Sequence, residues 1–308
     1  MSSLLLFPGQ GAQAVGMGRE LAEGLDECRA LFARAGDVLG FDLLKLCLEG
    51  PIEELTKSDV AQPAIFTVSV AARAALAHFA GGKLQVAGTA GHSLGEWTAL
   101  HEAGVVSFDD ALRVLRARGQ FMQEACQATP GGMLTIIGLP LDKVQEVART
   151  AGLEVANLNS PVQTVLSGHA DRIAAGEAAA KTAGAKRALR LTVAGAFHSS
   201  LMKPAADRLA DFLQGVEFHA PKCPVWSNAT GKPHADPDEI RRRMVAQVVS
   251  SVRWTDCFTD MAAAGLTAGF ECGPGTVLAG LAKRIVPDAS ITSIFDLAGA
   301  QEAAKLFV

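Results

Sequence analysis

The chain has 308 residues, and 49% of them are hydrophobic, which is enough for a large buried core arranged in one or two domains. The formal net charge is −4 and no basic tract is interleaved with aromatic side chains, so nucleic acid is not an expected partner. The six cysteines are scattered without a Cys-x-x-Cys pair, which is typical of a reducing cytoplasm and argues against a zinc site.

Two features of the chain argue against a membrane location. The N-terminal segment has no positively charged region, and its apolar run is too short for a signal peptide. The most apolar helix is expected around residues 63–80, and Arg73 in its middle indicates the core of a soluble protein rather than a bilayer span. We therefore expect a cytoplasmic protein that has no membrane partner.

Strand-like and helix-like segments alternate along most of the chain. Ser3–Phe7 predicts the first strand, and a helix is expected near residues 16–22. The later part is expected to continue with strands at 224–226 and 268–271 and a helix at 276–285. Such alternation predicts an α/β fold, in which helices cover a parallel sheet.

The rhythm changes in the middle of the chain, where the predicted order becomes β-α-β-β-α-β. The segments are strands at 133–138, 154–159, 163–168 and 186–193 and helices at 141–151 and 170–183. This order is that of a ferredoxin-like unit. We therefore predict a small domain at 129–196, inserted into a larger domain that consists of 1–128 and 197–308.

The pentapeptide Gly91-His92-Ser93-Leu94-Gly95 lies between a predicted short strand at 85–90 and a predicted helix at 94–103. A Gly-x-Ser-x-Gly sequence between a strand and a helix is the nucleophile elbow, whose glycines permit a sharp turn that exposes the serine oxygen. The following helix directs its N-terminal N–H groups toward that oxygen. The pentapeptide alone arises by chance, but its setting predicts Ser93 as a nucleophile.

A serine nucleophile needs a base, and His198 is the candidate among seven histidines. It precedes Ser199 and Ser200, which can cap a helix expected at 201–213, and the positive end of that helix would keep the imidazole neutral. The alternative is a histidine that only helps to cap the helix. His92 is expected to turn away from the site, and the remaining histidines are expected to be solvated: His78, His101, His169, His219 and His234.

Gln247 is the candidate that orients this base. It lies at i+7 from Ile240 in a helix expected at 237–249, beside the apolar stripe, and therefore faces inward. Its carbonyl could accept the N–H of His198. A glutamine that is hydrogen-bonded within the core fits the same spacing, and both interpretations stay open.

Arg118 is the most unusual charged residue of the sequence. The helix that opens at Ser107 has an inward stripe formed by Ala111, Leu115, Arg118 and Met122, whereas Arg113 and Arg116 fall outside it as surface charges. An arginine on an apolar face is costly unless an anion meets it. Arg118 therefore needs a buried Asp or Glu or a substrate carboxylate, which its planar guanidinium can bind at two points.

The loop after the first strand contains the pattern Gly9-x-Gly11-x-x-Ala14. It is similar to a dinucleotide-binding fingerprint, but no clean second strand ends in an acidic residue about twenty positions further on. The other interpretation is a turn that presents backbone N–H groups near the serine. An oxyanion hole would then use the N–H groups of Gln10 and Leu94.

Together these residues resemble the malonyl-CoA:acyl carrier protein transacylases of fatty-acid synthesis and the acyltransferase domains of polyketide synthases. The resemblance covers nearly the whole chain, and its motifs occur in the order of that family. They are Phe7-Pro-Gly-Gln-Gly11, Gln62-Pro63, Gly91-His-Ser-Leu-Gly-Glu96, Arg118-Gly119, Asn157-x-Asn-Ser-Pro161, Phe197-His198, Gln247 and Gly273-Pro-Gly275. The family has an α/β-hydrolase-like large domain with a parallel sheet and an inserted ferredoxin-like small domain, so the same fold class is expected here.

The resemblance implies a role for each site residue. Ser93 would attack the thioester of malonyl-CoA while His198 takes its proton, and Gln247 would orient His198. Gln10 and Leu94 would form the oxyanion hole.

The same resemblance implies the substrates. Arg118 would hold the malonyl carboxylate, and Phe197 would crowd an α-methyl group. The partners would be malonyl-CoA and acyl carrier protein. No cofactor or metal is implied, because CoA enters as part of the substrate and the phosphopantetheine belongs to the carrier protein.

Three other functions fit parts of the sequence less well. A serine esterase or thioesterase shares the elbow, but it needs no arginine in an apolar wall, and no acidic third triad member is evident in the order Ser, acid, His. A non-catalytic docking module would not need Ser93, His198 and Arg118 together. An NAD-dependent enzyme rests only on the glycine pattern near the N-terminus.

Overall fold

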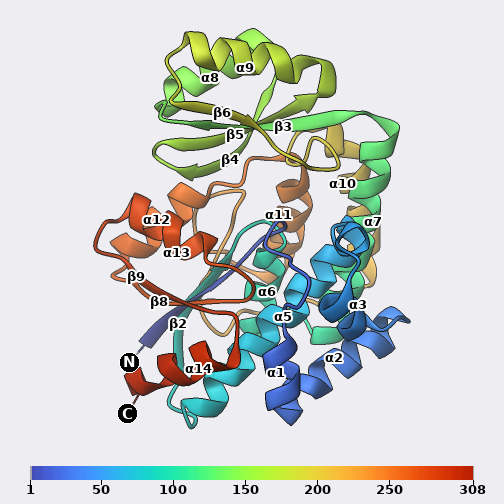
Figure 1. Ribbon diagram of the computed structural model, residues 1–308, viewed down its shortest axis with the longest axis vertical. Helices are drawn as coiled ribbons and strands as arrows, with labels where there is room; N and C mark the ends of the chain where they lie inside the picture. Colours follow the sequence, from blue (N-terminus) through green and yellow to red (C-terminus); the bar gives the residue numbers. More distant parts are fainter. Residues whose placement is uncertain (1, 308) are drawn as a thin grey trace.

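The computed structural model describes residues 2–307 of the chain (Figure 1). Within this range the larger sheet has five strands, all paired in parallel, in the order β7-β2-β1-β8-β9. They are β1 (Ser2–Phe7), β2 (Gln85–Gly91), β7 (Val225–Trp226), β8 (Ala268–Cys272) and β9 (Ser290–Ile294). The predicted parallel sheet is confirmed, and β9 is an edge strand that the sequence interpretation had not included.

Helices of the larger unit cover both faces of this sheet (Figure 1). They are α1 (Arg19–Gly24), α2 (Asp26–Leu39), α3 (Leu43–Glu49), α4 (Ile52–Leu55), α5 (Ser58–Phe79), α6 (Gly95–Glu102), α7 (Phe108–Ala128), α10 (Lys203–Phe212), α11 (Pro237–Val249), α12 (Trp254–Ala263), α13 (Val277–Ile285) and α14 (Leu297–Ala304). The first helix begins later than expected. The reason is that Gly16 and Gly18 have φ of 95° and 81° and form a turn before it.

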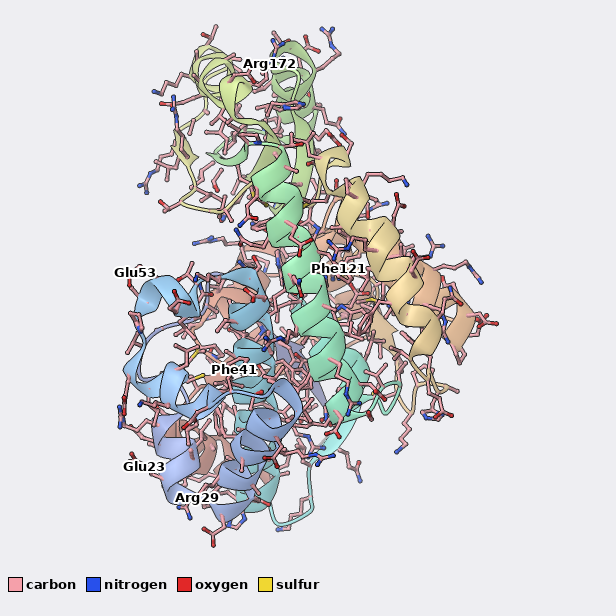
Figure 2. All side chains as sticks on the ribbon, turned by 90° about the vertical axis from the view of Figure 1, so that its right-hand side faces the viewer. Glu23, Arg29, Phe41, Glu53, Phe121 and Arg172 are labelled. Atoms are coloured by element: carbon pink, nitrogen blue, oxygen red, sulfur yellow. The ribbon has the colours of Figure 1, made fainter. Side chains whose placement is uncertain are left out.

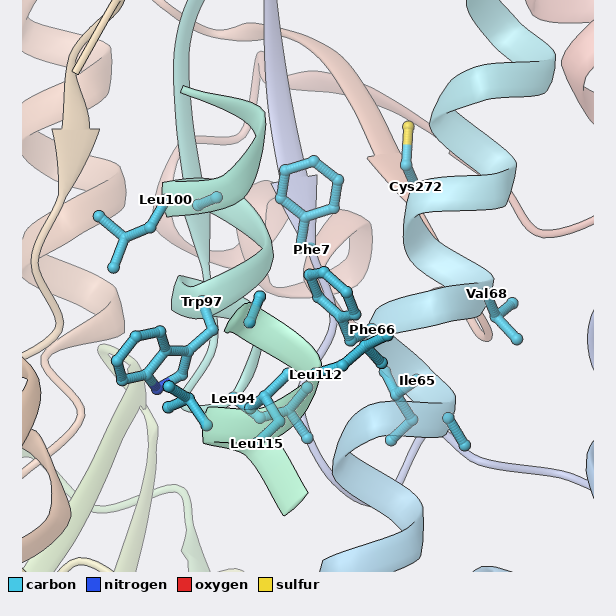
Figure 3. Packing of buried hydrophobic residues seen from close by; sticks show 14 of the residues in the cluster. Phe7, Ile65, Phe66, Val68, Leu94, Trp97, Leu100, Leu112, Leu115 and Cys272 are labelled. Atoms are coloured by element: carbon cyan, nitrogen blue, oxygen red, sulfur yellow. The ribbon is translucent and has the colours of Figure 1, made fainter. Parts of the chain in front are cut away.

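The central strand β1 shows why the sheet is buried on both sides. Alternate residues of a strand point to opposite faces. Leu5 and Phe7 belong to the core cluster that includes α5, α6 and α7, whereas Leu4 and Leu6 pack in a second cluster with α12 and α13. Figure 3 shows the first cluster, in which Phe7 lies against Phe66. A strand covered on both faces is expected to be continuously apolar, and β1 is so from Leu4 to Phe7.

Helix α5 is long and apolar enough to cross a membrane by length and composition, but 72% of its most apolar window is buried inside the protein. This burial identifies it as a core helix. Its Pro63 is accommodated within the helix, where the Pro63 carbonyl accepts a hydrogen bond from Thr67 Oγ1 (2.8 Å). The expectation drawn from Arg73 therefore agrees with the packing of this helix.

The middle of the chain forms a separate antiparallel sheet with the order β4-β5-β3-β6. Its elements are β3 (Gly131–Ile137), α8 (Leu141–Ala151), β4 (Glu154–Ser160), β5 (Gln163–His169), α9 (Ile173–Thr182) and β6 (Arg187–Arg190). Both helices lie on one face and share a core cluster with the sheet (Figure 1). The predicted fold class, with a ferredoxin-like β-α-β-β-α-β unit, is confirmed, and the boundaries 129 and 196 stay a prediction.

Helix α7 joins the two sheets. Ser107 caps its N-terminus by accepting from the backbone N–H of Asp110 (3.0 Å). Figure 2 shows this helix rising past Phe121 toward the small unit that carries Arg172. Arg116 on this helix was expected to be a surface charge, but it is half-buried and donates to the backbone oxygen of Leu39 (3.1 Å).

Candidate active site

Ser93 occupies the sharp turn between β2 and α6. Its φ is 53°, a left-handed value that is costly for a residue with a side chain. Both flanking positions must be glycine because a side chain would clash there. A Cβ on Gly91 would lie 2.0 Å from the carbonyl carbon of Gly95, and a Cβ on Gly95 would lie 2.2 Å from the oxygen of Phe7. The local sequence therefore dictates the elbow, as expected.

The strained backbone of Ser93 is held from both sides. Asn228, which follows β7, accepts from Ser93 N through Oδ1 (2.6 Å) and donates through Nδ2 to the oxygen of Gly91 (2.8 Å). Gln247 donates through Nε2 to the oxygen of Ser93 (2.9 Å). Sequence reasoning missed Asn228, and no local signal marks it, because it lies 135 residues from Ser93.

His198 lies in hydrogen-bond contact with Ser93, with 2.7 Å between its Nε2 and the Ser93 Oγ. Its other ring nitrogen, Nδ1, lies 2.9 Å from the backbone oxygen of Gln247. A carbonyl only accepts, so Nδ1 carries the hydrogen and Nε2 is free to take the serine proton. The residue predicted to orient His198 is in place, but the acceptor is its backbone carbonyl and not its inward-facing side chain.

Burial keeps His198 neutral. Loss of solvent, followed by the nearby charge of Arg118, lowers the pKa of His198 from 6.5 to about 3. The predicted helix cap does not form, because Ser199 Oγ donates to the oxygen of Ala196 (2.7 Å). The N–H of Ser200 instead donates to the carboxylate of Glu154 (3.0 Å). The imidazole is thus neutral and available as a base because it is buried, and not because of the helix that follows it.

Arg118 is 1% exposed and binds three oxygen atoms that carry no formal charge. Nη1 donates to Gln62 Oε1 (2.7 Å), and Nη2 donates to Gln247 Oε1 (3.0 Å) and to Ser93 Oγ (3.2 Å). Burial lowers the pKa of Arg118 to about 10, and the charge of Glu96 offsets part of this effect, so the guanidinium remains protonated at neutral pH.

No ion pair of Arg118 with an Asp or Glu occurs within residues 2–307. Its Nε has no hydrogen-bond partner there either. The sequence left two possible partners for Arg118, a buried Asp or Glu and a substrate carboxylate. The first of these is not present as an ion pair among the residues that the structure describes. The arrangement leaves a cation beside Ser93 that an anionic substrate group can meet.

The loop after β1 packs directly against the elbow. A Cβ on Gly9 would lie 2.6 Å from the oxygen of His92, and the side chain of Gln10 donates to Ser58 Oγ (3.1 Å). The backbone N–H groups of Gln10 and Leu94 have no acceptor in the described part of the chain. The loop does not run directly into a helix, as a dinucleotide fingerprint requires, because α1 begins only at Arg19.

The site contains a pocket of about 390 Å³, a size that suits a small-molecule group, and neither Leu94 nor Gln247 lines it. Ser93, His198, Arg118 and Gln10 contribute to its wall, as does Phe197, which is 7% exposed. Among residues 2–307, no cluster of three or more His, Cys, Asp or Glu side chains could hold a metal ion.

Three histidines were wrongly expected to point away or to be solvated. His92 lines the pocket, and its Nε2 lies 2.9 Å from Asn159 Oδ1. His234 is buried, with Nε2 2.8 Å from Glu96 Oε1, and His101 contacts the oxygen of Val106 through Nδ1 (3.1 Å). The exposed histidines are those predicted to be so: His78, His169 and His219.

A serine that a neutral histidine can deprotonate forms esters with acyl groups. Two backbone N–H groups without acceptors near such a serine suit the oxyanion that its attack creates. Fold and site together define the class of serine-dependent acyl-transfer enzymes.

Comparison with known proteins gives the family. A family model described as acyl transferase domain matches residues 4–302. Malonyl CoA-acyl carrier protein transacylase of Escherichia coli O157:H7 is 46% identical over 91% of this chain and 92% of its own, and that of Bacillus subtilis is 40% identical over 91% and 89%. The chain belongs to the acyl transferase family that includes these transacylases.

Solved structures agree with this assignment. An acyl carrier protein S-malonyltransferase from Vibrio cholerae has a TM-score of 0.92 at 41% identity, covering 97% of this chain and 98% of that one. A malonyl-transacylase in complex with its type II polyketide synthase acyl-carrier protein has a TM-score of 0.95 at 39% identity, covering 99% and 100%. The α/β architecture with its two sheets is therefore that of known malonyltransferases.

Proposed function

We propose that this protein transfers a malonyl group from malonyl-CoA to the phosphopantetheine thiol of acyl carrier protein through a malonyl-serine intermediate. The observation that carries the proposal is Arg118, a buried cation that donates to Ser93 Oγ and has no ion-pair partner among residues 2–307. A malonyl thioester places a carboxylate two bonds from the carbonyl that the serine attacks. The names of the relatives support the same substrate and partner.

In the first half-reaction, Ser93 Oγ attacks the thioester carbonyl carbon while its proton passes to His198 Nε2. The N–H groups of Gln10 and Leu94 stabilise the resulting oxyanion. The intermediate then collapses, the carbon–sulfur bond breaks, and His198 returns the proton to the departing CoA thiolate. Arg118 holds the malonyl carboxylate throughout, so the acyl group stays in position.

The second half-reaction reverses these steps with a different thiol. His198 Nε2 removes the proton of the phosphopantetheine thiol, the sulfur attacks the malonyl ester, and the Ser93 oxygen leaves with the proton. The kinetics are then ping-pong. The proposed reaction needs no bound cofactor or metal, because both thiols arrive on substrates and the acyl group keeps its oxidation state.

Phe197 is the proposed selectivity residue. Its ring precedes the base and lies in the pocket wall, where it is largely buried. An α-methyl group on the acyl chain would have to displace this ring, and overpacking of a close-packed site is unfavourable. Methylmalonyl-CoA is therefore a poor substrate under this proposal.

A serine esterase or thioesterase is the alternative, and two observations disfavour it. The base is oriented by the backbone carbonyl of Gln247 and not by an acidic triad member. The pocket also contains Arg118, which a hydrolase of neutral esters does not need.

The proposed location is the cytoplasm. All six cysteines are free thiols, five of them buried and one partly so, which suits a reducing compartment. The relatives with this architecture are bacterial enzymes.

Intact-mass spectrometry tests the reaction class. Brief mixing with malonyl-CoA is expected to add one malonyl group to the protein, and holo acyl carrier protein is expected to remove it much faster than water does. Acetyl-CoA serves as the control donor, because it lacks the carboxylate. Clearance by water at the rate of clearance by carrier protein would favour the hydrolase.

Replacing Arg118 by alanine is expected to weaken malonyl transfer by about 3 kcal/mol, or roughly 100-fold in kcat/KM, through loss of a charge-assisted contact. The acetyl reaction should fall less, because acetyl has no carboxylate to bind and loses only the contact between Arg118 and Ser93 Oγ. Steady-state rates with both donors measure the effect as a malonyl-to-acetyl ratio. An equal loss for both donors would show that Arg118 does not bind the carboxylate.

A further inference from the structure

A buried pair of a glutamate and a histidine lies behind the active site, and the proposed reaction does not use it. Glu96 in the first turn of α6 and His234 in the loop after β7 both have fully buried side chains, with 2.8 Å between Glu96 Oε1 and His234 Nε2. Burying a carboxylate is costly unless its oxygens are paired and hydrogen-bonded. The two residues lie 138 positions apart in sequence, so their contact depends on the packing of separate elements.

The partners of Glu96 show what the pair can do. Its Oε2 accepts from Gln247 Nε2 (2.6 Å) and from the backbone N–H of Asn228 (3.1 Å). These are the two residues whose side chains hold Ser93, Asn228 at the backbone nitrogen and Gln247 at the backbone oxygen. One carboxylate thus connects both sides of the support for the nucleophile.

His234 sets the orientation of that carboxylate. An ionised carboxylate only accepts, so His234 Nε2 carries the hydrogen and fixes Oε1, leaving Oε2 for Gln247 and Asn228. The backbone N–H of His234 in turn donates to the oxygen of Val225 in β7 (2.8 Å), which ties the histidine to the sheet. Neither Glu96 nor His234 lines the pocket.

We propose that Glu96 and His234 are positioning residues that hold Asn228 and Gln247 and thereby keep Ser93 in its left-handed, reactive conformation. A serine at φ 53° has a strained backbone, so its conformation must be maintained by its neighbours. Gln247 also holds His198 through its backbone oxygen, so the pair supports the geometry of the base as well, whereas Arg118 keeps a second anchor at Gln62. It does so without touching substrate.

Two substitutions at one position separate positioning from simple packing. In His234→Gln the amide N–H can reach the place of Nε2 and still donate to Glu96. In His234→Asn the side chain is one methylene shorter and cannot. We expect the asparagine variant to lose about 10- to 100-fold in the rate of Ser93 acylation, because small displacements of a nucleophile have effects of this order. The glutamine variant should recover most of that loss.

The measurement is the labelling rate of Ser93 by a neutral fluorophosphonate, together with kcat and KM for malonyl-CoA and acetyl-CoA. The expected result is a parallel fall in labelling and in both kcat values, with KM and the malonyl-to-acetyl ratio unchanged. His101→Gln is the matched control, because it alters another enclosed histidine, on α6, that does not contact this network. Thermal unfolding midpoints of all variants show whether the fold is intact.

Three outcomes would overturn the proposal. They are a folded His234→Asn variant that reacts at the wild-type rate, a loss of activity that glutamine does not rescue, and a loss limited to malonyl-CoA. Asn228→Ala is a second test if His234→Asn does not fold, and wild-type labelling of that variant would also contradict the proposal. The inference depends on the proposed function only for the choice of substrates. If the wild-type protein reacts with fluorophosphonate but not with malonyl-CoA, the proposed substrate is wrong, but the labelling rates still test the positioning role of Glu96 and His234.

Discussion

Replacing Ser93 by alanine is expected to abolish the malonyl adduct and to lower kcat for malonyl transfer on the order of 10⁶-fold, as loss of a serine nucleophile does elsewhere. The reason is geometric, because Ser93 Oγ lies 2.7 Å from His198 Nε2, the base, and 3.2 Å from Arg118 Nη2, the proposed binding group for the carboxylate. The atom that accepts the acyl group therefore contacts both of these residues. Intact-mass spectrometry after mixing with malonyl-CoA measures the adduct directly, and carrier-protein malonylation measures kcat.

Ser199→Ala is the matched control for this prediction. Ser199 is fully buried and directly follows the base, but its hydroxyl donates to the oxygen of Ala196 and not to the site. The control variant should retain the adduct. A malonyl adduct that persists in Ser93→Ala would assign the nucleophile to another residue and would contradict the mechanism proposed here.

Replacing His198 by alanine is expected to lower the rate of Ser93 acylation by about 10²- to 10⁴-fold, the usual contribution of a general base. The structure places no second base on Ser93 Oγ, whose other neighbour within the described residues is the cation Arg118. Stopped-flow release of CoA measures this step. A variant that acylates at nearly the wild-type rate would show that another group removes the serine proton.

The pH profile of the wild-type protein examines the same residue without a substitution. Burial and Arg118 lower the pKa of His198 to about 3, and protonation would remove its capacity to act as a base. The acylation rate is therefore expected to stay level as pH falls from 8 to about 5, where an unperturbed histidine would already be mostly protonated. A decline centred near 6.5 would mean that His198 is more exposed to solvent during the reaction.

The elbow illustrates what local sequence can specify. A Cβ on Gly91 or on Gly95 would come within 2.0 or 2.2 Å of its neighbours, so the turn admits only glycine, and the pattern is visible in five consecutive residues. The amphipathic stripe that placed Arg118 in an apolar wall is equally local, because a helix repeats every 3.6 residues. Both predictions needed no knowledge of distant parts of the chain.

Gln247 shows where such reasoning ends. The stripe of α11 correctly turned its side chain inward, but periodicity does not indicate which carbonyl of a residue meets a partner from another element. The backbone oxygen of Gln247 orients His198, while its side chain binds Arg118, Glu96 and the oxygen of Ser93. The neutrality of His198 likewise comes from enclosure by other elements and not from the helix that follows it.

Short-range patterns were sufficient for the alternating architecture, the elbow with Ser93 and the inward-facing Arg118, because each follows from periodicity or from backbone geometry. His198 was chosen on a helix cap that does not form, and its contact with Ser93 depends on tertiary packing. Packing between distant segments was needed to show that Arg118 has no buried acid beside it, that Asn228 supports the nucleophile, and that His234 is buried against Glu96. The physical reason is the length of chain between the partners, 135 and 138 residues. Contacts of this range form only when separate helices and strands pack together, and no local pattern records them.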